Sequence, residues 1–207
     1  FEEGWGFSAL VSSGGRNVLF DCGWDGRLLR NNLFRLGFAF SDIDAVVLSH
    51  PHWDHVTGLP EVLGDPAVER SLEVVAPSGF SRNLLSEIGR RATVREVRTA
   101  QEIVPGIWAT GPLGGEVPEQ ALVLRGESEV AVLTGCGHPG LAANLAAGSS
   151  LGLARWLIGG LHDCTLPELE RSLKDSPGLT AVLCHCTRCK TEASSALPDR
   201  VRMGAAG

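Results

Sequence analysis

The stretch His50-Pro51-His52-Trp53-Asp54-His55 places three imidazoles and one carboxylate within six consecutive residues. The apolar run Ile43-Asp44-Ala45-Val46-Val47-Leu48-Ser49 comes directly before it and is typical of a buried strand. A strand end gives side chains a rigid support, and in open α/β sheets ligands bind at such ends. The stretch therefore predicts an α/β fold that carries a metal-binding loop after a buried strand.

The ligand types in this loop indicate which ions it suits. Neutral imidazole nitrogen and carboxylate oxygen bind zinc, manganese or iron, and catalytic zinc sites combine three protein ligands with an open position for water. Four such groups so close together would repel protons and one another unless a cation lay between them. We expect one or two ions, zinc first, with manganese or iron as the alternatives.

The composition is that of an ordinary globular protein. The chain has 207 residues, of which 43% are hydrophobic and 20% charged, and its formal net charge is −6. These values predict one compact domain over residues 1–207, located in the cytoplasm, with no membrane partner. The acidic balance and the lack of a basic block predict a small-molecule substrate and no nucleic-acid partner, and they leave the oligomeric state open.

The cysteines and the start of the chain carry two further expectations. Six cysteines are an even number, but the chain is large and shows no secretory leader, so reduced thiols are expected rather than a disulfide framework. The chain begins at Phe1 and runs directly into Gly4-Trp5-Gly6. This beginning suggests that an N-terminal strand is missing.

Short periodic segments predict two mixed sheets with outer helices. Leucines at helical spacing, from Leu28 to Leu36, predict a helix, and the alanine-rich stretch 141–150 predicts another. Further strands are expected at 7–11, 17–20, 72–76, 107–109, 120–124, 130–134, 155–159 and 181–184.

The pattern His50-x-His52-x-Asp54-His55 is similar to the signature of the metallo-β-lactamase superfamily, whose members are mostly metal-dependent hydrolases. Other segments resemble, in the same order, the branch described as dihydropterin ribofuranosyl-aminobenzene-phosphate synthase-like. These segments are Leu36-Gly37, the run from Ser41 to His50, Thr134-Gly135-Cys136-Gly137-His138-Pro139-Gly140, Gly159-Gly160-Leu161-His162 and His185-Cys186-Thr187. The resemblance covers nearly the whole chain and implies a four-layer αβ/βα sandwich.

All six histidines of the chain fall inside these motifs. His138 follows the strand expected at 130–134, so it is expected to join His50 and His52 on one metal. Asp54 and His55 are then expected to hold a second metal together with His185.

Two positions leave alternatives open. Many superfamily members place a bridging aspartate after the strand that here spans 155–159, but this chain continues as Gly160-Leu161-His162-Asp163. His162 contacts metal or substrate, or Asp163 supplies the bridge, or both are polar groups at the rim of the site. Asp21 stands where the superfamily usually has Asp-Thr-Gly; it is either hydrogen-bonded beside the metal site or a plain turn or cap residue, and Cys22 replaces the threonine.

The segment Cys184-His185-Cys186-x-x-Cys189 contains a Cys-x-x-Cys motif, which marks zinc or redox chemistry in some proteins. We favour His185 as the ligand, with Cys186 and Cys189 as packed thiols. Arg188 and Lys190 are expected either to bind an anionic substrate or to be solvated charges.

The function predicted from these residues is a metal-dependent hydrolase of a small anionic substrate that uses a metal-activated water. Asp54 is expected to accept a proton, and His162 to act in catalysis or substrate binding. One alternative is a pterin-pathway synthase acting on a phosphoribosyl substrate. A second is a non-catalytic metal-binding or ligand-sensing protein.

Overall fold

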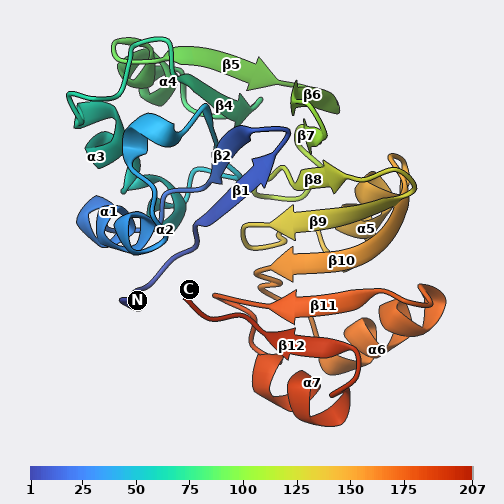
Figure 1. Ribbon diagram of the computed structural model, residues 1–207. Helices are drawn as coiled ribbons and strands as arrows, with labels where there is room; N and C mark the ends of the chain where they lie inside the picture. Colours follow the sequence, from blue (N-terminus) through green and yellow to red (C-terminus); the bar gives the residue numbers. More distant parts are fainter. Residues whose placement is uncertain (207) are drawn as a thin grey trace.

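The computed structural model describes residues 1–206, and it consists of two sheets that lie face to face between two layers of helices (Figure 1). The first sheet has five strands in the order β1-β2-β3-β4-β5. β1 and β2 are antiparallel, and the other neighbours are parallel. The strands are β1 (Ala9–Ser13), β2 (Arg16–Phe20), β3 (Ala45–Val47), β4 (Glu73–Pro77) and β5 (Thr93–Val97).

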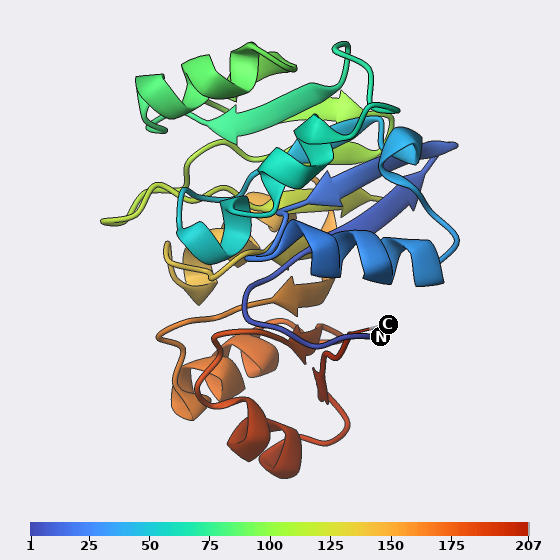
Figure 2. The same cartoon turned by 90° about the vertical axis from the view of Figure 1, so that its left-hand side faces the viewer.

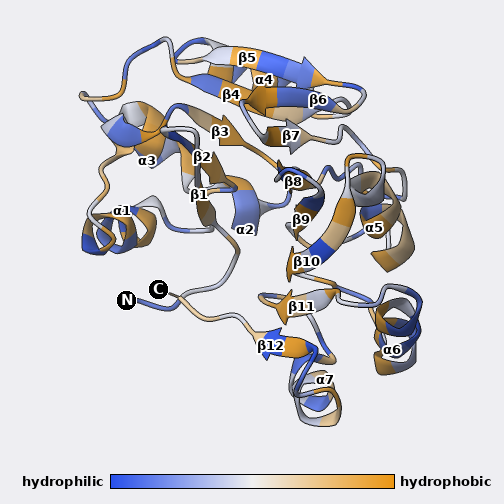
Figure 3. Ribbon diagram, turned by 45° about the vertical axis from the view of Figure 1, so that its right-hand side comes forward, coloured by the Kyte–Doolittle hydropathy of each residue, from blue (hydrophilic) through white to orange (hydrophobic). Residues whose placement is uncertain are grey.

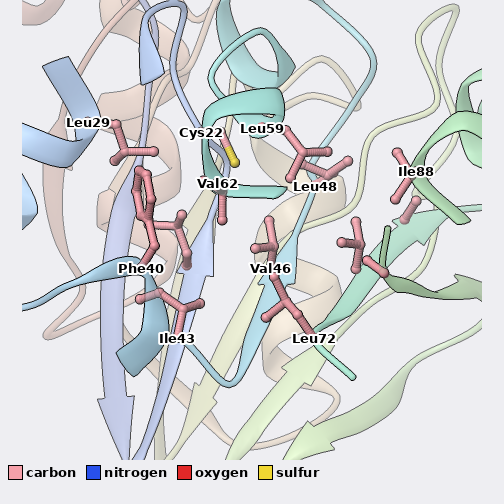
Figure 4. Packing of buried hydrophobic residues seen from close by; sticks show 14 of the residues in the cluster. Cys22, Leu29, Phe40, Ile43, Val46, Leu48, Leu59, Val62, Leu72 and Ile88 are labelled. Carbon is pink, nitrogen blue, oxygen red and sulfur yellow. The ribbon is translucent and has the colours of Figure 1, made fainter. Parts of the chain in front are cut away.

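Helices cover the outer face of this sheet. They are α1 (Gly26–Arg35), the 3₁₀ turn Phe40–Asp42, α2 (Trp53–Val56), α3 (Leu59–Gly64) and α4 (Arg82–Gly89). The Asp25 side chain begins α1 by accepting the backbone N–H groups of Arg27 and Leu28. Figure 4 shows the apolar cluster beneath these helices, which includes Leu48, Leu59 and Val62. Their burial holds the helices against the sheet.

The second sheet has seven strands in the order β12-β11-β10-β9-β8-β7-β6. β9 to β12 are parallel, whereas β6 to β9 are antiparallel. The strands are β6 (Gln101–Val104), β7 (Ile107–Ala109), β8 (Leu122–Arg125), β9 (Glu129–Thr134), β10 (Leu153–Gly159), β11 (Thr180–Leu183) and β12 (Val201–Met203). Its outer face carries α5 (Leu141–Ser149), α6 (Leu166–Asp175) and α7 (Lys190–Ala196) (Figure 2).

The core between the two sheets is apolar. Phe20 and Val47 of the first sheet pack in one cluster with Leu122 and Leu133 of the second. Figure 3 shows β3 in the hydrophobic colour, which is expected because this central strand is buried on both faces. Two mixed sheets with outer helices confirm the predicted four-layer αβ/βα sandwich.

Several elements differ from the prediction. The strand expected over 43–49 is reduced to β3, and the Ser49 N–H beyond it donates to the Asp21 side chain instead of to a neighbouring strand. β5, β6 and β12 were not predicted, and neither were α6 and α7. β12 has three residues and includes exposed Arg202, so it shows no alternation that a sequence pattern reveals. None of the helices within residues 1–206 has the length and apolar character needed to cross a bilayer.

Candidate metal centre

Loops from both sheets meet at one place, and each follows the carboxyl end of a parallel strand. Asp21 follows β2, and the loop with His50, His52, Asp54 and His55 follows β3. In the other sheet, β9, β10 and β11 lead into the loops that carry His138, His162 and His185. Parallel strands end at the same edge of their sheet, which explains why residues distant in sequence gather here.

The three histidines predicted to share one metal lie together. His50 Nε2 is 3.0 Å from His52 Nδ1. The ring centroid of His138 is 4.9 Å from that of His50 and 5.0 Å from that of His52. His50 is fully buried, whereas His52 is exposed, so this group extends from the interior to the surface.

The residues predicted to hold a second metal form a neighbouring group. Asp54 Oδ2 is 3.1 Å from His185 Nε2 and 4.0 Å from His55 Nε2. The His55 and His185 ring centroids are 5.1 Å apart. The two groups adjoin, because the His50 and His55 centroids are 4.2 Å apart.

Burial and mutual repulsion keep most of these imidazoles neutral. Burial lowers the pKa of His138 and of His185 to about 4, and neighbouring histidines add to the effect. The pKa of His50 is lowered by the same causes. Neutral imidazole is the form that binds metals, so these three histidines are already in their ligand state at neutral pH.

Asp21 holds one ring of the cluster in place. Its fully buried carboxylate accepts the Ser49 N–H at 2.7 Å and the Ser49 hydroxyl at 2.6 Å, and its Oδ2 lies 2.7 Å from His55 Nδ1. A carboxylate accepts, so His55 Nδ1 carries a proton and Nε2 faces the cluster. Burial lowers the pKa of His55, but the charge and hydrogen bond of Asp21 outweigh it and raise that pKa.

Ser49 orients a second ring. Because its hydroxyl hydrogen is given to Asp21, the oxygen accepts from His50 Nδ1 at 2.8 Å. His50 Nε2 is then left facing the cluster. Asp21 also has a φ of 59°, a left-handed conformation that is uncommon outside glycine and that turns the chain at the end of β2.

Glu119 is a central residue of the site that sequence reasoning missed. Its buried carboxylate accepts four backbone N–H groups, those of Gly135, Cys136, Gly137 and His138, at 2.9 to 3.1 Å. Glu119 precedes β8, which runs antiparallel to β9, so the start of one strand lies beside the end of the other. No motif marks this acid in the sequence, because the backbone groups that it binds come from another segment.

Buried imidazole nitrogens without hydrogen-bond partners support a metal in this cluster. His138 Nε2 and His162 Nδ1 are buried without a hydrogen-bond partner among residues 1–206. His185 Nε2 lies near Asp54 but lacks hydrogen-bond alignment. Unpaired buried polar atoms are costly. A shared cation would satisfy those of His138 and His185, and a cation or a substrate group would satisfy that of His162.

The other predicted site residues differ in how exposed they are and in what they contact. His162 is half-buried, with its ring centroid 5.3 Å from that of His138. The Asp163 side chain is 79% exposed and 3.9 Å from His162 Nε2, so the alternative in which Asp163 bridges two metals is wrong. Arg188 is exposed, whereas Lys190 donates to the His185 carbonyl oxygen at 3.2 Å.

The two cysteines predicted to be packed thiols differ from each other. Cys189 is buried at the start of α7. Cys186 is half-buried beside the site, where its Sγ lies within 4.8 Å of ligand atoms of both Cys136 and His162. The neighbours of Cys186 are thus groups that could bind a metal, and its assignment as a packed thiol stays a prediction. All six cysteines are free thiols.

A cavity of about 700 Å³ opens beside His185. Trp5, Trp24 and Lys190 line it, together with residues of α1 and of the segment 204–206. Trp5 stands edge-on to His185 with the ring centroids 5.3 Å apart. The cavity thus gives the histidine cluster a large neighbouring space.

Curated relatives match parts of the chain. The Anti-Pycsar protein Apyc1 of Paenibacillus harenae is 31% identical over 117 residues, which are 48% of this chain and 47% of that protein. A Ribonuclease Z of Bradyrhizobium sp. (strain ORS 278) is 36% identical over 70 residues, 34% of this chain and 22% of that protein. The chain therefore spans less than half the length of either relative.

The second relative corrects one prediction. Nucleic acid was excluded as a partner because the chain is acidic and has no basic block. That exclusion is wrong, because proteins named as ribonucleases share part of this sequence. Net charge describes the whole surface, whereas substrate binding depends on the local groups at a site.

A solved structure shares the fold of this chain, and a family comparison identifies its superfamily. Tm1679, described as a metal-dependent hydrolase of the beta-lactamase superfamily, superposes with a TM-score of 0.78 at 24% identity, covering 100% of this chain and 91% of that one. The family described as Metallo-beta-lactamase superfamily matches residues 4–136. The chain therefore belongs to the metallo-β-lactamase superfamily.

Proposed function

We propose that the protein is a metal-dependent hydrolase of a small anionic substrate. The observation that carries the proposal is the convergence of five imidazoles and the Asp54 carboxylate in one cluster, with most of the imidazoles neutral. Such a donor set suits zinc, with iron or manganese as alternatives.

The two groups of the cluster suggest two ion positions. His50, His52 and His138 would hold one ion, and Asp54, His55 and His185 would hold the other. When bound, such ions lower the pKa of a water ligand and polarise the carbonyl or phosphoryl oxygen of a substrate. Asp21 would act as a positioning residue, since it fixes the His55 ring.

The remaining residues would serve the substrate. The Asp54 carboxylate lies 3.1 Å from His185 Nε2 and 4.0 Å from His55 Nε2, and it would accept a proton during hydrolysis. His162 would contact the substrate and take part in proton transfer, while Arg188 and Lys190 would bind its anionic group. The exposure of His52 and the half-buried state of His162 support catalysis over a sealed, non-catalytic metal site, because a reactant needs access.

The relatives widen the range of substrates that deserve a test. The name Ribonuclease Z indicates that one relative cleaves RNA, so a short RNA belongs beside small phosphodiesters, esters and lactones. The cytoplasmic location and the single domain over residues 1–207 stay predictions.

The finer resemblance to the pterin synthase-like branch also stays a prediction. It rests on Leu36-Gly37, the run from Ser41 to His50, and the segments around His138, His162 and His185. Incubation with a phosphoribosyl donor and a pterin, followed by product analysis, separates synthase from hydrolase. A new carbon–carbon bond in the product would favour the synthase.

Metal removal tests the proposed function directly. We expect the purified protein to contain one or two zinc, iron or manganese ions by elemental analysis, and to hydrolyse at least one member of the substrate panel. Chelation should abolish this activity, and the returned metal should restore it. His52→Asn should lower the metal content, whereas Trp53→Phe, at the exposed neighbouring residue, should not. A protein without metal, or activity that survives chelation, would contradict the proposal.

A further inference from the structure

The thiol of Cys136 lies at the centre of the cluster. Cys136 follows β9 and is 3% exposed. Its Sγ is 3.2 Å from His55 Nε2. It lies within 4.8 Å of ligand atoms of His50 and His138, and separately of His55 and His185. This one sulfur atom therefore borders both groups of the proposed metal centre.

The loop after β10 places no carboxylate between the two groups of the proposed metal centre. The Asp163 side chain faces solvent. At Gly160, a Cβ would lie 2.4 Å from the Gly135 carbonyl oxygen and 2.9 Å from Cys186 Sγ, so no larger residue fits there. The loop that supplies a bridging aspartate in many superfamily members thus brings Gly160 and His162, and no carboxylate, to the cluster.

The surroundings of Cys136 are those of a ligand rather than of a packed thiol. A buried cysteine commonly behaves as a small hydrophobe among apolar side chains. Here the nearest ligand-type neighbours are imidazole nitrogens and the Cys186 thiol. Its backbone is also held, because Glu119 accepts the Cys136 N–H at 2.9 Å. A rigid loop and donor neighbours are what a metal ligand needs.

We propose that Cys136 Sγ bridges the two metal positions as a thiolate, in place of the bridging carboxylate expected in many superfamily members. The inference rests on the proposed dinuclear centre. On binding, the S–H bond breaks, its proton passes to solvent, and the sulfur electron pairs form bonds to both ions. A soft thiolate bridge makes the centre prefer zinc or iron to manganese.

Cobalt titration tests this inference without relying on activity. Co²⁺ bound to thiolate gives a near-ultraviolet charge-transfer band that histidine and carboxylate ligands do not give. With the metal-free full chain, we expect the band to grow until two equivalents of Co²⁺ are bound, because both ions bond the same sulfur. Cys136→Ser should lose the band, while Cys189→Ser, which changes a buried thiol outside these ligand groups, should keep it.

Cys186→Ser distinguishes the neighbouring thiol. A band that persists in Cys136→Ser and vanishes in Cys186→Ser would overturn the assignment. A band that stops growing at one equivalent would also overturn it, since that indicates a ligand to a single ion. Cys136→Asp is the control for a folding defect. Its carboxylate should keep the binding of two ions, and the variant should lack the thiolate band.

Failure of the two proposals gives different results. Wild-type protein that binds no Co²⁺, Zn²⁺ or Fe²⁺ overturns the metal-dependent hydrolase itself, and the bridge with it. Wild-type protein that binds two ions without a thiolate band overturns only the role of Cys136.

Discussion

Removal of the Glu119 carboxylate should loosen the loop that carries Cys136 and His138. Four backbone N–H groups depend on this side chain, three on Oε1 and one on Oε2. Each buried donor left without a partner costs about 1–3 kcal/mol, so Glu119→Ala should lower the free energy of unfolding by roughly 4 kcal/mol or more. Burial raises the pKa of Glu119 and so opposes its charged form, which offsets part of this cost.

Glu119→Gln gives a milder and more informative change. Its amide oxygen replaces one carboxylate oxygen, but its NH₂ group meets a backbone N–H instead of accepting from it. The loss should be about 1–3 kcal/mol. Glu102→Gln is the matched control, because Glu102 Oε1 accepts only the Gly106 N–H, at 2.8 Å in an exposed turn. It should change stability by about 0.5 kcal/mol or less.

Urea unfolding of the chelator-treated proteins, followed by tryptophan fluorescence, measures these differences, and elemental analysis measures the effect on metal content. We expect the loss of stability to decrease from Glu119→Ala to Glu119→Gln to Glu102→Gln. We also expect metal content to fall in the two Glu119 variants. Equal stability and equal metal content in Glu119→Gln and Glu102→Gln would refute the structural role given to Glu119.

Two other predictions follow from the site and the core. The pKa of His138 and of His185 is about 4 in the folded protein against 6.5 as the ordinary value, so the unfolded chain takes up protons first as the pH falls. Stability of the metal-free protein should therefore decrease from about pH 6.5 towards pH 4, by at most about 1.4 kcal/mol per pH unit for each histidine. Urea unfolding at several pH values checks this, and a slope unchanged in His138→Asn would contradict it. Leu122→Ala removes a fully buried side chain from between the sheets and should cost about 2–5 kcal/mol, against about 0.5 kcal/mol or less for Leu153→Ala, whose side chain is 54% exposed. Thermal unfolding of both variants measures this difference in stability. A similar loss of stability in the two variants would argue against a tightly packed interface between the sheets.

The elements predicted from sequence were those with a local signal. The helix from Leu28 to Leu36 has apolar residues at helical spacing and became α1, and the hairpin before it has a glycine turn. The charged edge strand β5 and the three-residue strand β12 have no such pattern, because their neighbours in the sheet determine them.

The residue types around His50 to His55, together with the scattered histidines, were enough to predict a metal site and its superfamily. A dense set of ligands within one loop carries its chemistry in the sequence itself. Tertiary structure alone decided the positions of Glu119, Asp163 and Cys136. Glu119 binds backbone groups from another strand, and Asp163 turns to solvent. Cys136 borders both histidine groups only because parallel strands of two sheets end at the same place, and no spacing along the chain reports such a meeting.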